Sequence, residues 1–238
     1  MRIIDRQSPN YDARPDSVAI DILVLHYTGM RTAEAALARL CDPEAKVSAH
    51  YTIDRDGRIY RHVAEELRAR HAGVSYWAGV RDVNSSSIGI ELVNPGHEFG
   101  YVPFADQQIG ALIDLSREIF ERHPIPPRRV VGHSDVAPAR KIDPGELFPW
   151  MRLAEYGIGV WPQASVPLEK PPTERIADLL SRFGYGVPPE VDWPLETVIA
   201  AFQRRFRPGK IDGVVDSETV TLLAALVSST ELGSSDRR

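Results

Sequence analysis

Apolar runs of strand length alternate with amphipathic helical patterns over the first 160 residues. The runs that predict buried strands are residues 17–29, 86–93 and 128–133. Residues 49–63 form two alternating segments around Asp56-Gly57, which predicts a hairpin. Apolar positions at helical spacing predict helices at 31–43 and 104–123. Strands interleaved with helices, with a hairpin among them, predict an α/β fold with a mixed central β-sheet flanked by helices.

The pattern changes after residue 160. Residues 161–174, "WPQASVPLEKPPTE", contain four prolines and show no period, which is typical of a stiff linker. Three amphipathic patterns follow and predict a small three-helix domain. We therefore expect a catalytic domain over 1–160, a linker over 161–172, a helical domain over 173–228 and a disordered tail over 229–238. A linker of this kind predicts that the first domain folds without the second.

Composition and charge narrow the classes of partner. With 43% hydrophobic and 26% charged residues in 238, the chain is typical of a globular protein. A formal net charge of −5 gives no basic footprint for nucleic acid or for anionic membranes. Cys41 is the single cysteine, so an internal disulfide and a zinc site of several thiolates are both excluded. A metal would have to be held by histidine and carboxylate.

The N-terminal segment shows no apolar stretch of signal-peptide length, and no run in the sequence reaches the length that spans a membrane. These features favour a cytoplasmic monomer without a membrane span. A chain that starts after a removed signal would look the same, so a periplasmic location stays open.

Residues 130–150, "VVGHSDVAPARKIDPGELFPW", gather unusual chemistry in one loop stiffened by prolines. His133 ends one predicted strand, His26 ends another, and Asp143 lies ten residues after His133. Two imidazoles and a carboxylate leave one open position, as a hydrolytic zinc site requires. Spacing alone also allows two hydrogen-bonded histidines that bind nothing. Glu91, within the apolar run "IGIEL", either faces solvent or is held for use, because burying an unpaired carboxylate is costly.

Five motifs resemble the zinc-dependent N-acetylmuramoyl-L-alanine amidase family, and within it the bacterial branch that cleaves anhydromuropeptides. They are "LHYTG" (25–29), "SAHYTIDRDGRIY" (48–60), "HAGVSYW" (71–77), "SIGIELVN" (87–94) and "GHSDVAPARKIDPGELFPW" (132–150). They stand in the family's order and span residues 20 to 150. The resemblance implies one zinc ion per chain and a peptidoglycan or muropeptide substrate.

Position by position, the resemblance implies that His26, His133 and Asp143 hold the zinc. Glu91 matches the family's acidic catalytic residue, and Lys141 matches the lysine that faces the developing oxyanion. Both roles suit amide hydrolysis, which needs a proton acceptor and positive charge near the carbonyl oxygen.

Three further residues are weaker candidates for binding the substrate. Arg140 could pair with a stem-peptide carboxylate through its guanidinium fork, or lie solvated in the loop. His71 and Trp77, in "HAGVSYW", could line the groove for sugar and peptide, because an aromatic face can stack on a saccharide ring.

Residues 201–226, "AFQRRFRPGKIDGVVDSETVTLLAAL", resemble the small helical peptidoglycan-binding domain. The alternative is a helical appendage that packs on the enzyme and binds nothing.

Three functions compete at this stage. The first is a zinc amidase that cuts the bond between N-acetylmuramic acid, or its 1,6-anhydro form, and L-alanine, in cell-wall degradation or recycling. The second is a peptidoglycan sensor without catalysis, for which the loss of a metal ligand would be expected. The third is a peptidase that cuts within the stem peptide. Intact polymer and soluble anhydromuropeptide both stay open as substrates.

Overall fold

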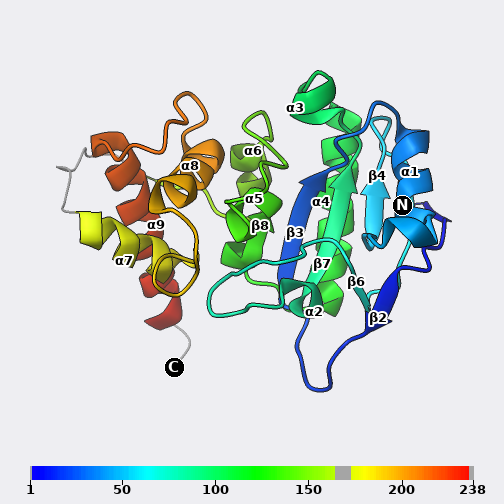
Figure 1. The fold of residues 1–238 in the computed structure, drawn as a ribbon, viewed down its shortest axis with the longest axis horizontal. Coiled ribbons are helices and arrows are strands. Elements are labelled where there is room, and N and C mark those ends of the chain that lie inside the picture. The colour runs from blue at the N-terminus through cyan, green and yellow to red at the C-terminus, as the bar shows by residue number, and fades with distance from the viewer. Residues whose placement is uncertain (1, 164–172, 236–238) are drawn as a thin grey trace.

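A six-stranded sheet forms the centre of the molecule. The computed structural model describes residues 2–163 and 173–235, and Figure 1 shows the sheet between its helices. The strand order is β1-β5-β4-β7-β3-β8. Within this sheet β4 and β5 are antiparallel to each other, and every other neighbouring pair is parallel. The bounds are β1 Ile3–Asp5, β3 Ile22–Tyr27, β4 Tyr51–Ile53, β5 Ile59–Arg61, β7 Ser87–Leu92 and β8 Val130–Gly132. The predicted α/β fold with a mixed sheet is confirmed.

Short elements complete the first 160 residues. The strands β2 (Tyr11–Ala13) and β6 (Leu67–Ala69) pair in a second, antiparallel sheet. The hairpin predicted at Asp56-Gly57 joins β4 to β5, with Gly57 at a φ of 84° that favours glycine. The helices are α1 Ala33–Cys41, α2 Val83–Ser86, α3 Gly96–Phe99, α4 Asp106–Arg122, α5 His133–Val136 and α6 Trp150–Glu155, with 3-10 turns at Pro43–Ala45 and Pro127–Arg129.

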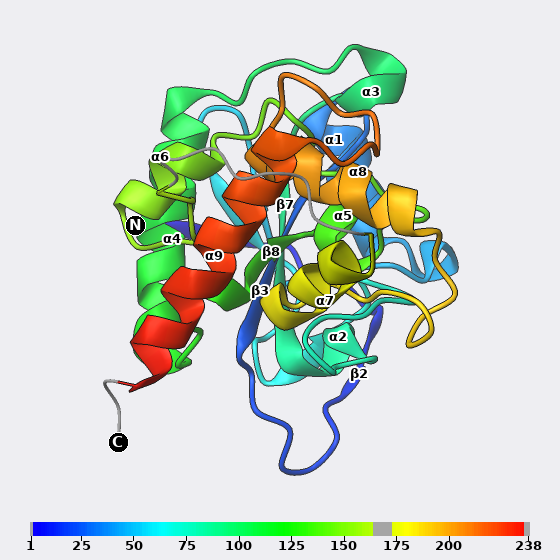
Figure 2. The ribbon, with the colours of Figure 1, turned by 90° about the vertical axis from the view of Figure 1, so that its left-hand side faces the viewer.

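Alternation along the strands gives the main sheet two different faces. In β3, Leu23 and Leu25 pack with the apolar side of α4, which lies along one face in Figure 2. Ile22 and Val24 belong to a second core on the opposite face. Because side chains alternate with a period of two, His26 shares the face of Ile22 and Val24. The sheet therefore presents His26 on the side that α4 does not cover.

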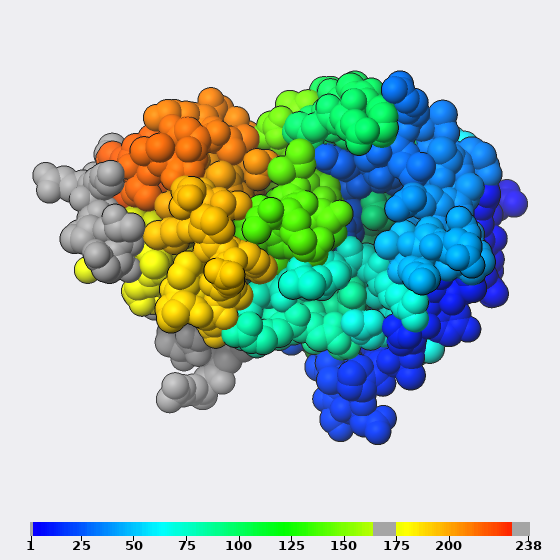
Figure 3. All heavy atoms as spheres, viewed as in Figure 1, coloured from blue at the N-terminus to red at the C-terminus, as the bar shows by residue number. Residues whose placement is uncertain are grey.

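The C-terminal helices pack onto that second face. They are α7 Thr173–Phe183, α8 Leu195–Phe206 and α9 Ser217–Ser235, and we call them the C-terminal module. One continuous apolar core contains Val24, Val131 and Trp77 together with side chains of all three helices, such as Phe202. Figure 3 shows the module pressed against the rest of the molecule.

A catalytic domain that is joined to the helical domain only by a stiff linker, as expected from the sequence, does not match this packing. The amide of Ala78 donates to the carbonyl of Gly184 (2.7 Å), and a Cβ on Gly184 would come within 2.8 Å of the Trp77 ring. Trp161, at the start of the predicted linker, packs near Phe206 with 5.9 Å between ring centroids. The remainder of that linker, 164–172, lies outside the described residues. The module is thus an integral part of the core.

The predicted tail is a second correction. Residues 229–238 were expected to be disordered because they are small and polar, whereas α9 continues to Ser235. Residues 236–238 lie outside the described part. Once a packed segment has formed a helix, each further residue adds one backbone hydrogen bond, so the helix can continue beyond its apolar positions.

Candidate metal and catalytic site

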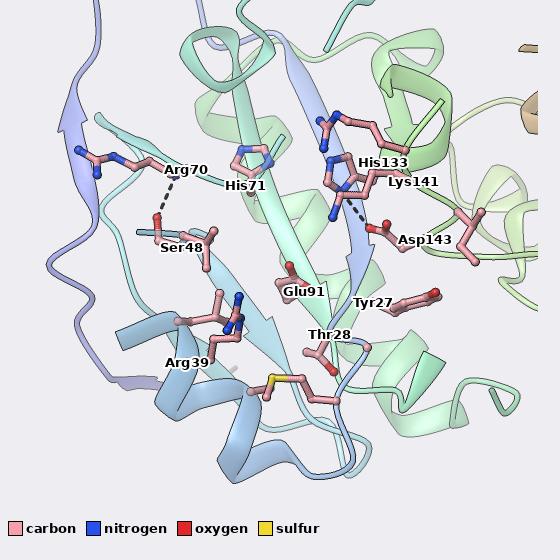
Figure 4. A pocket seen from close by; sticks show the side chains of 17 residues that line it. Tyr27, Thr28, Arg39, Ser48, Arg70, His71, Glu91, His133, Lys141 and Asp143 are labelled. Carbon is pink, nitrogen blue, oxygen red and sulfur yellow. Dashed lines mark hydrogen bonds and ion pairs between the residues drawn. The ribbon is translucent and has the colours of Figure 1, made fainter. Parts of the chain in front are cut away.

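His26, His133 and Asp143 converge at one point at the ends of β3 and β8. The Nδ1 atoms of the two histidines are 2.9 Å apart, and each lies 3.1 Å from Oδ2 of Asp143. All three side chains are buried, and within the described residues they form a group able to hold a metal ion, which we call the metal group. The structure thus brings together the three predicted ligands, of which Figure 4 labels His133 and Asp143.

Hydrogen bonds fix the tautomer of His133. Its Nε2 lies 3.0 Å from the carbonyl oxygen of Ala72, which can only accept. Nε2 therefore carries the proton, and in the neutral ring Nδ1 presents a lone pair to the centre of the group.

A longer chain of hydrogen bonds fixes His26. The hydroxyl of Ser87 donates to the carbonyl of Val83 (2.5 Å), so it accepts from Nε2 of His71 (3.2 Å). Nδ1 of His71 is then an acceptor, and the protonated Nε2 of His26 donates a hydrogen bond to it at 3.0 Å. Burial and the neighbouring imidazoles hold the pKa of His71 well below its usual value, so its ring is neutral.

Three electron-pair donors consequently point at each other with no proton between them. Burial, followed by the adjacent His133, lowers the pKa of His26 to about 4, which keeps that ring uncharged. Burial alone would raise the pKa of Asp143, but His133 and His26 lower it well below the usual range, so it is a carboxylate. Tetrahedral zinc with bonds of about 2.0–2.1 Å places its ligands roughly 3.3 Å apart. The observed separations and the donor set suit such a cation.

Hydrogen bonds hold the loop that carries Asp143 against α5 and Tyr101. The amide of Ser134, next to His133, donates to the carbonyl of Asp143 at 2.8 Å. The hydroxyl of Tyr101 donates to the carbonyl of Pro144 (2.6 Å) and accepts from the amide of Leu147 (3.1 Å). These bonds hold the loop in place without any contribution from the Asp143 carboxylate.

Glu91 lies beside the metal group on the neighbouring strand. It pairs in register with His26 across β7 and β3, so both side chains are on the face of the sheet opposite α4. Its Oε2 is buried and has no hydrogen-bond partner among the described residues. Burial raises the pKa of Glu91 well above its usual value, and the nearby Asp143 carboxylate adds to the rise. A carboxylate held in this way can take up and return a proton.

A pocket of about 380 Å³ opens above these groups. It is lined by the metal group's His133 and Asp143, by Glu91 and Lys141, and on its far side by α1. Figure 3 shows the hollow between the loop around residue 140 and the blue segment that contains α1. In Figure 4 the Lys141 side chain lies near His133 and Asp143. The pocket therefore joins the metal group to both predicted catalytic residues.

The other three predicted residues occupy different positions. Arg140 lines the pocket, but its guanidinium donates to the carbonyls of Ala72 (2.5 Å) and Val74 (2.6 Å). His71 also lines the pocket, and its two ring nitrogens are hydrogen-bonded to His26 and Ser87. Trp77 is 1% exposed and packs against Phe183 and Tyr185 of the C-terminal module. Its ring has no free face for a saccharide, so the prediction for Trp77 does not hold in this structure.

Sequence reasoning missed the residues that orient the site. Ser87 acts through its hydrogen bond to His71, and Tyr101 through two hydrogen bonds to the loop that carries Asp143. Ser87 is the first residue of β7 and Tyr101 lies between α3 and α4, and neither position carries a local signal of this role. The position of Ser87 two residues before Gly89 and four before Glu91, on the same strand face, is the one clue available.

Known proteins resemble this chain along most of its length. N-acetylmuramoyl-L-alanine amidase AmiD of Escherichia coli is 39% identical over 94% of this chain and 90% of its own. A structure of AmiD with anhydro-N-acetylmuramic acid-L-Ala-D-gamma-Glu-L-Lys superposes with a TM-score of 0.81 at 38% identity, covering 91% of this chain and 92% of that one.

Two other relatives differ in coverage. AmpDh3 of Pseudomonas aeruginosa, in complex with anhydromuramic pentapeptide, has a TM-score of 0.81 at 35% identity, covering 93% of this chain and 97% of its own. The 1,6-anhydro-N-acetylmuramyl-L-alanine amidase AmpD of Haemophilus influenzae is 37% identical over 61% of this chain and 87% of its own. A family model described as N-acetylmuramoyl-L-alanine amidase matches residues 16–146. That range contains Glu91 and the three side chains of the metal group. By family match and by full-length similarity, the chain belongs to the N-acetylmuramoyl-L-alanine amidase family.

Proposed function

We propose that this protein is a zinc-dependent amidase that hydrolyses the bond between N-acetylmuramic acid, or its 1,6-anhydro form, and L-alanine of the stem peptide. The observation that carries the proposal is that the metal group borders the same pocket as Glu91, a half-buried residue whose Oε2 has no hydrogen-bond partner among the described residues. The muropeptides bound in the AmiD and AmpDh3 structures support the substrate class.

His26, His133 and Asp143 would hold the zinc. A zinc ion there would supply Lewis-acid polarisation of the scissile carbonyl and a lowered pKa for a coordinated water. The protein's own contribution is to aim the two Nδ1 lone pairs, through Ala72 and through the chain from His26 to His71 and Ser87. Such supporting bonds orient the ligands and raise their basicity.

Glu91 would move the proton. Amide hydrolysis needs a base for the attacking water and an acid for the leaving nitrogen, and one carboxyl group can serve in turn. A pKa raised by burial suits both halves, because the carboxylate is then basic enough to accept the proton and acidic enough to release it. Glu91 lines the pocket, so its carboxylate would meet a water that is held there.

Lys141 would stabilise charge on the substrate. Its side chain lies on the pocket wall, where negative charge gathers on the carbonyl oxygen as the tetrahedral state forms. Arg140, which shares the wall, donates to backbone carbonyls through Nε and Nη2, in three hydrogen bonds. We propose that its remaining donor atoms contact a stem-peptide carboxylate.

The C-terminal module is proposed to bind peptidoglycan, on the basis of its sequence resemblance. The glutamine of its "FQ" motif, Gln203, accepts from the amides of Asp212 and Gly213 and donates to the carbonyl of Val214. That residue therefore holds the turn before α9. The motif identifies the fold of the module, and binding needs its own test with purified sacculi.

Product analysis tests the proposed reaction. Incubation with a purified anhydromuropeptide should give the free stem peptide and anhydro-N-acetylmuramic acid, identified by mass spectrometry. A shortened peptide still joined to the sugar would indicate a peptidase, and intact substrate with measurable binding would indicate a sensor. Running intact sacculi in parallel shows which form of substrate is turned over faster.

Glu91→Gln is expected to lower kcat by roughly 10²- to 10⁴-fold, the usual contribution of a general acid-base group. The amide keeps the shape of the side chain but cannot accept the proton, so zinc content and fold should be unchanged. The exposed Glu121→Gln on α4 is the matched control and should keep the wild-type rate. A near wild-type kcat for Glu91→Gln would remove this residue from the mechanism.

A further inference from the structure

The Asp135 side chain, close to the metal group, accepts three hydrogen bonds. It lies two residues after His133 on α5 and is 1% exposed. Its Oδ2 accepts from the amide of Gly132 (2.8 Å) and from the guanidinium of Arg205 (2.7 Å), and its Oδ1 accepts from the hydroxyl of Tyr185 (2.6 Å). The two long-range partners both come from the C-terminal module.

Arg205 contacts the same segment at a second point. Its guanidinium donates to the carbonyl of Val130 on β8 (3.0 Å), and its Cζ lies 4.0 Å from the centre of the Trp150 ring. Arg205 is 3% exposed, so the ion pair with Asp135 is shielded from water. Arg205 thus bonds to Val130 before His133 and to Asp135 after it.

The segment needs support from outside. A helix of four residues, such as α5, has too few internal bonds to be stable by itself. The ring of His133 is oriented through Ala72, but its backbone position depends on the strand before it and the helix after it. Metal ligation tolerates only a few tenths of an ångström in ligand distance. A small shift of α5 would therefore weaken the metal group.

We propose that Tyr185 and Arg205 are positioning residues for the amidase site: through Asp135 and Val130 they fix the backbone that carries the metal ligand His133. This inference rests on the proposed zinc site. It gives the C-terminal module a role in the chemistry that is separate from any binding of peptidoglycan.

Arg207 provides a matched control. It lies two residues after Arg205 and is also buried, with 6% exposure. Its ion pairs are to Asp216 and Glu218, inside the module. Arg207→Met removes a buried arginine from the same helix end without touching residues 130–135, so it reports the general cost of disturbing the module.

The test compares Arg205→Met with Arg207→Met in the full-length zinc-loaded protein. Zinc affinity is measured by competition with a chromophoric chelator, and kcat and KM are measured on an anhydromuropeptide. We expect Arg205→Met to weaken zinc binding by roughly 10-fold or more and to lower kcat with little change in KM. Arg207→Met should stay within about twofold of the wild-type zinc affinity, because it is not coupled to the metal group. Equal zinc affinities for the two variants would overturn the proposal.

Tyr185→Phe keeps the test decisive if Arg205→Met fails to fold. It deletes one hydroxyl and preserves the ring that packs on Trp77. It should shift zinc affinity in the same direction by a smaller factor, and an unchanged affinity would count against the proposal. A wild-type protein that binds no zinc would defeat the proposed function itself, whereas tight zinc binding that is indifferent to both changes would defeat only this inference.

Discussion

Replacing Asp143 with alanine is expected to strip the zinc and to reduce hydrolysis by roughly 10³-fold or more, because the metal supplies several kcal/mol of charge stabilisation. The change removes the single anionic ligand and leaves two neutral imidazoles. Elemental analysis after dialysis measures the zinc content, and the rate on a soluble anhydromuropeptide measures turnover. Wild-type protein treated with a chelator should behave like the variant and recover when Zn²⁺ is added.

The loop should stay closed in this variant, which makes the result interpretable. Its main ties are the Ser134 amide on the carbonyl of residue 143 and the Tyr101 hydroxyl on the carbonyl of Pro144, and neither involves the deleted carboxylate. Asp106→Ala, at an exposed aspartate paired with Arg152, is the control for loss of a surface ion pair. An Asp143→Ala protein that keeps one zinc per chain and a near wild-type rate would show that this residue is not a ligand.

The metal group illustrates what sequence could and could not predict. Strand patterns placed His26 and His133 at strand ends, and the structure confirms β3 and β8 there. Periodicity could not choose Asp143 from the other carboxylates, because the loop reaches the metal group through backbone bonds and a tyrosine over 40 residues away. The resemblance to a family supplied that assignment.

Side chains that face another segment were predicted least well. Trp77 lies in a motif typical of the family, and its burial depends on Gly184, Phe183 and Tyr185, which are more than 100 residues further along the chain. Arg205, in "FQRRF", has the pattern of a solvated helical face. Its burial is compensated by the ion pair with Asp135 and the hydrogen bond to the Val130 carbonyl, and no local period contains either pairing. The three-residue strands β1, β2 and β6 are likewise too short to show alternation.

Ending the chain after residue 163 is expected to destabilise the remaining domain severely and to abolish hydrolysis of even a small soluble muropeptide. Truncation uncovers Trp77, worth about 2–3 kcal/mol. It also removes the helices that share a core with Val24 and Val131, and it takes Tyr185 and Arg205 away from Asp135. Exposing each buried apolar side chain costs about 1.5–3 kcal/mol, so the summed loss approaches the whole stability of a typical domain, about 5–15 kcal/mol.

The AmpD relative aligns with 61% of this chain and 87% of its own length, so much of this chain has no counterpart in that match. This protein places an apolar indole and a buried charge against its C-terminal helices. Thermal unfolding and the rate on a soluble anhydromuropeptide measure the effect, and a chain ended after Ser229 is the control because the contacts named above all precede it. If the chain ended after residue 163 unfolds at the wild-type temperature and cleaves at the wild-type rate, the module is a separate domain, and the predicted linker describes the protein better than the shared core does.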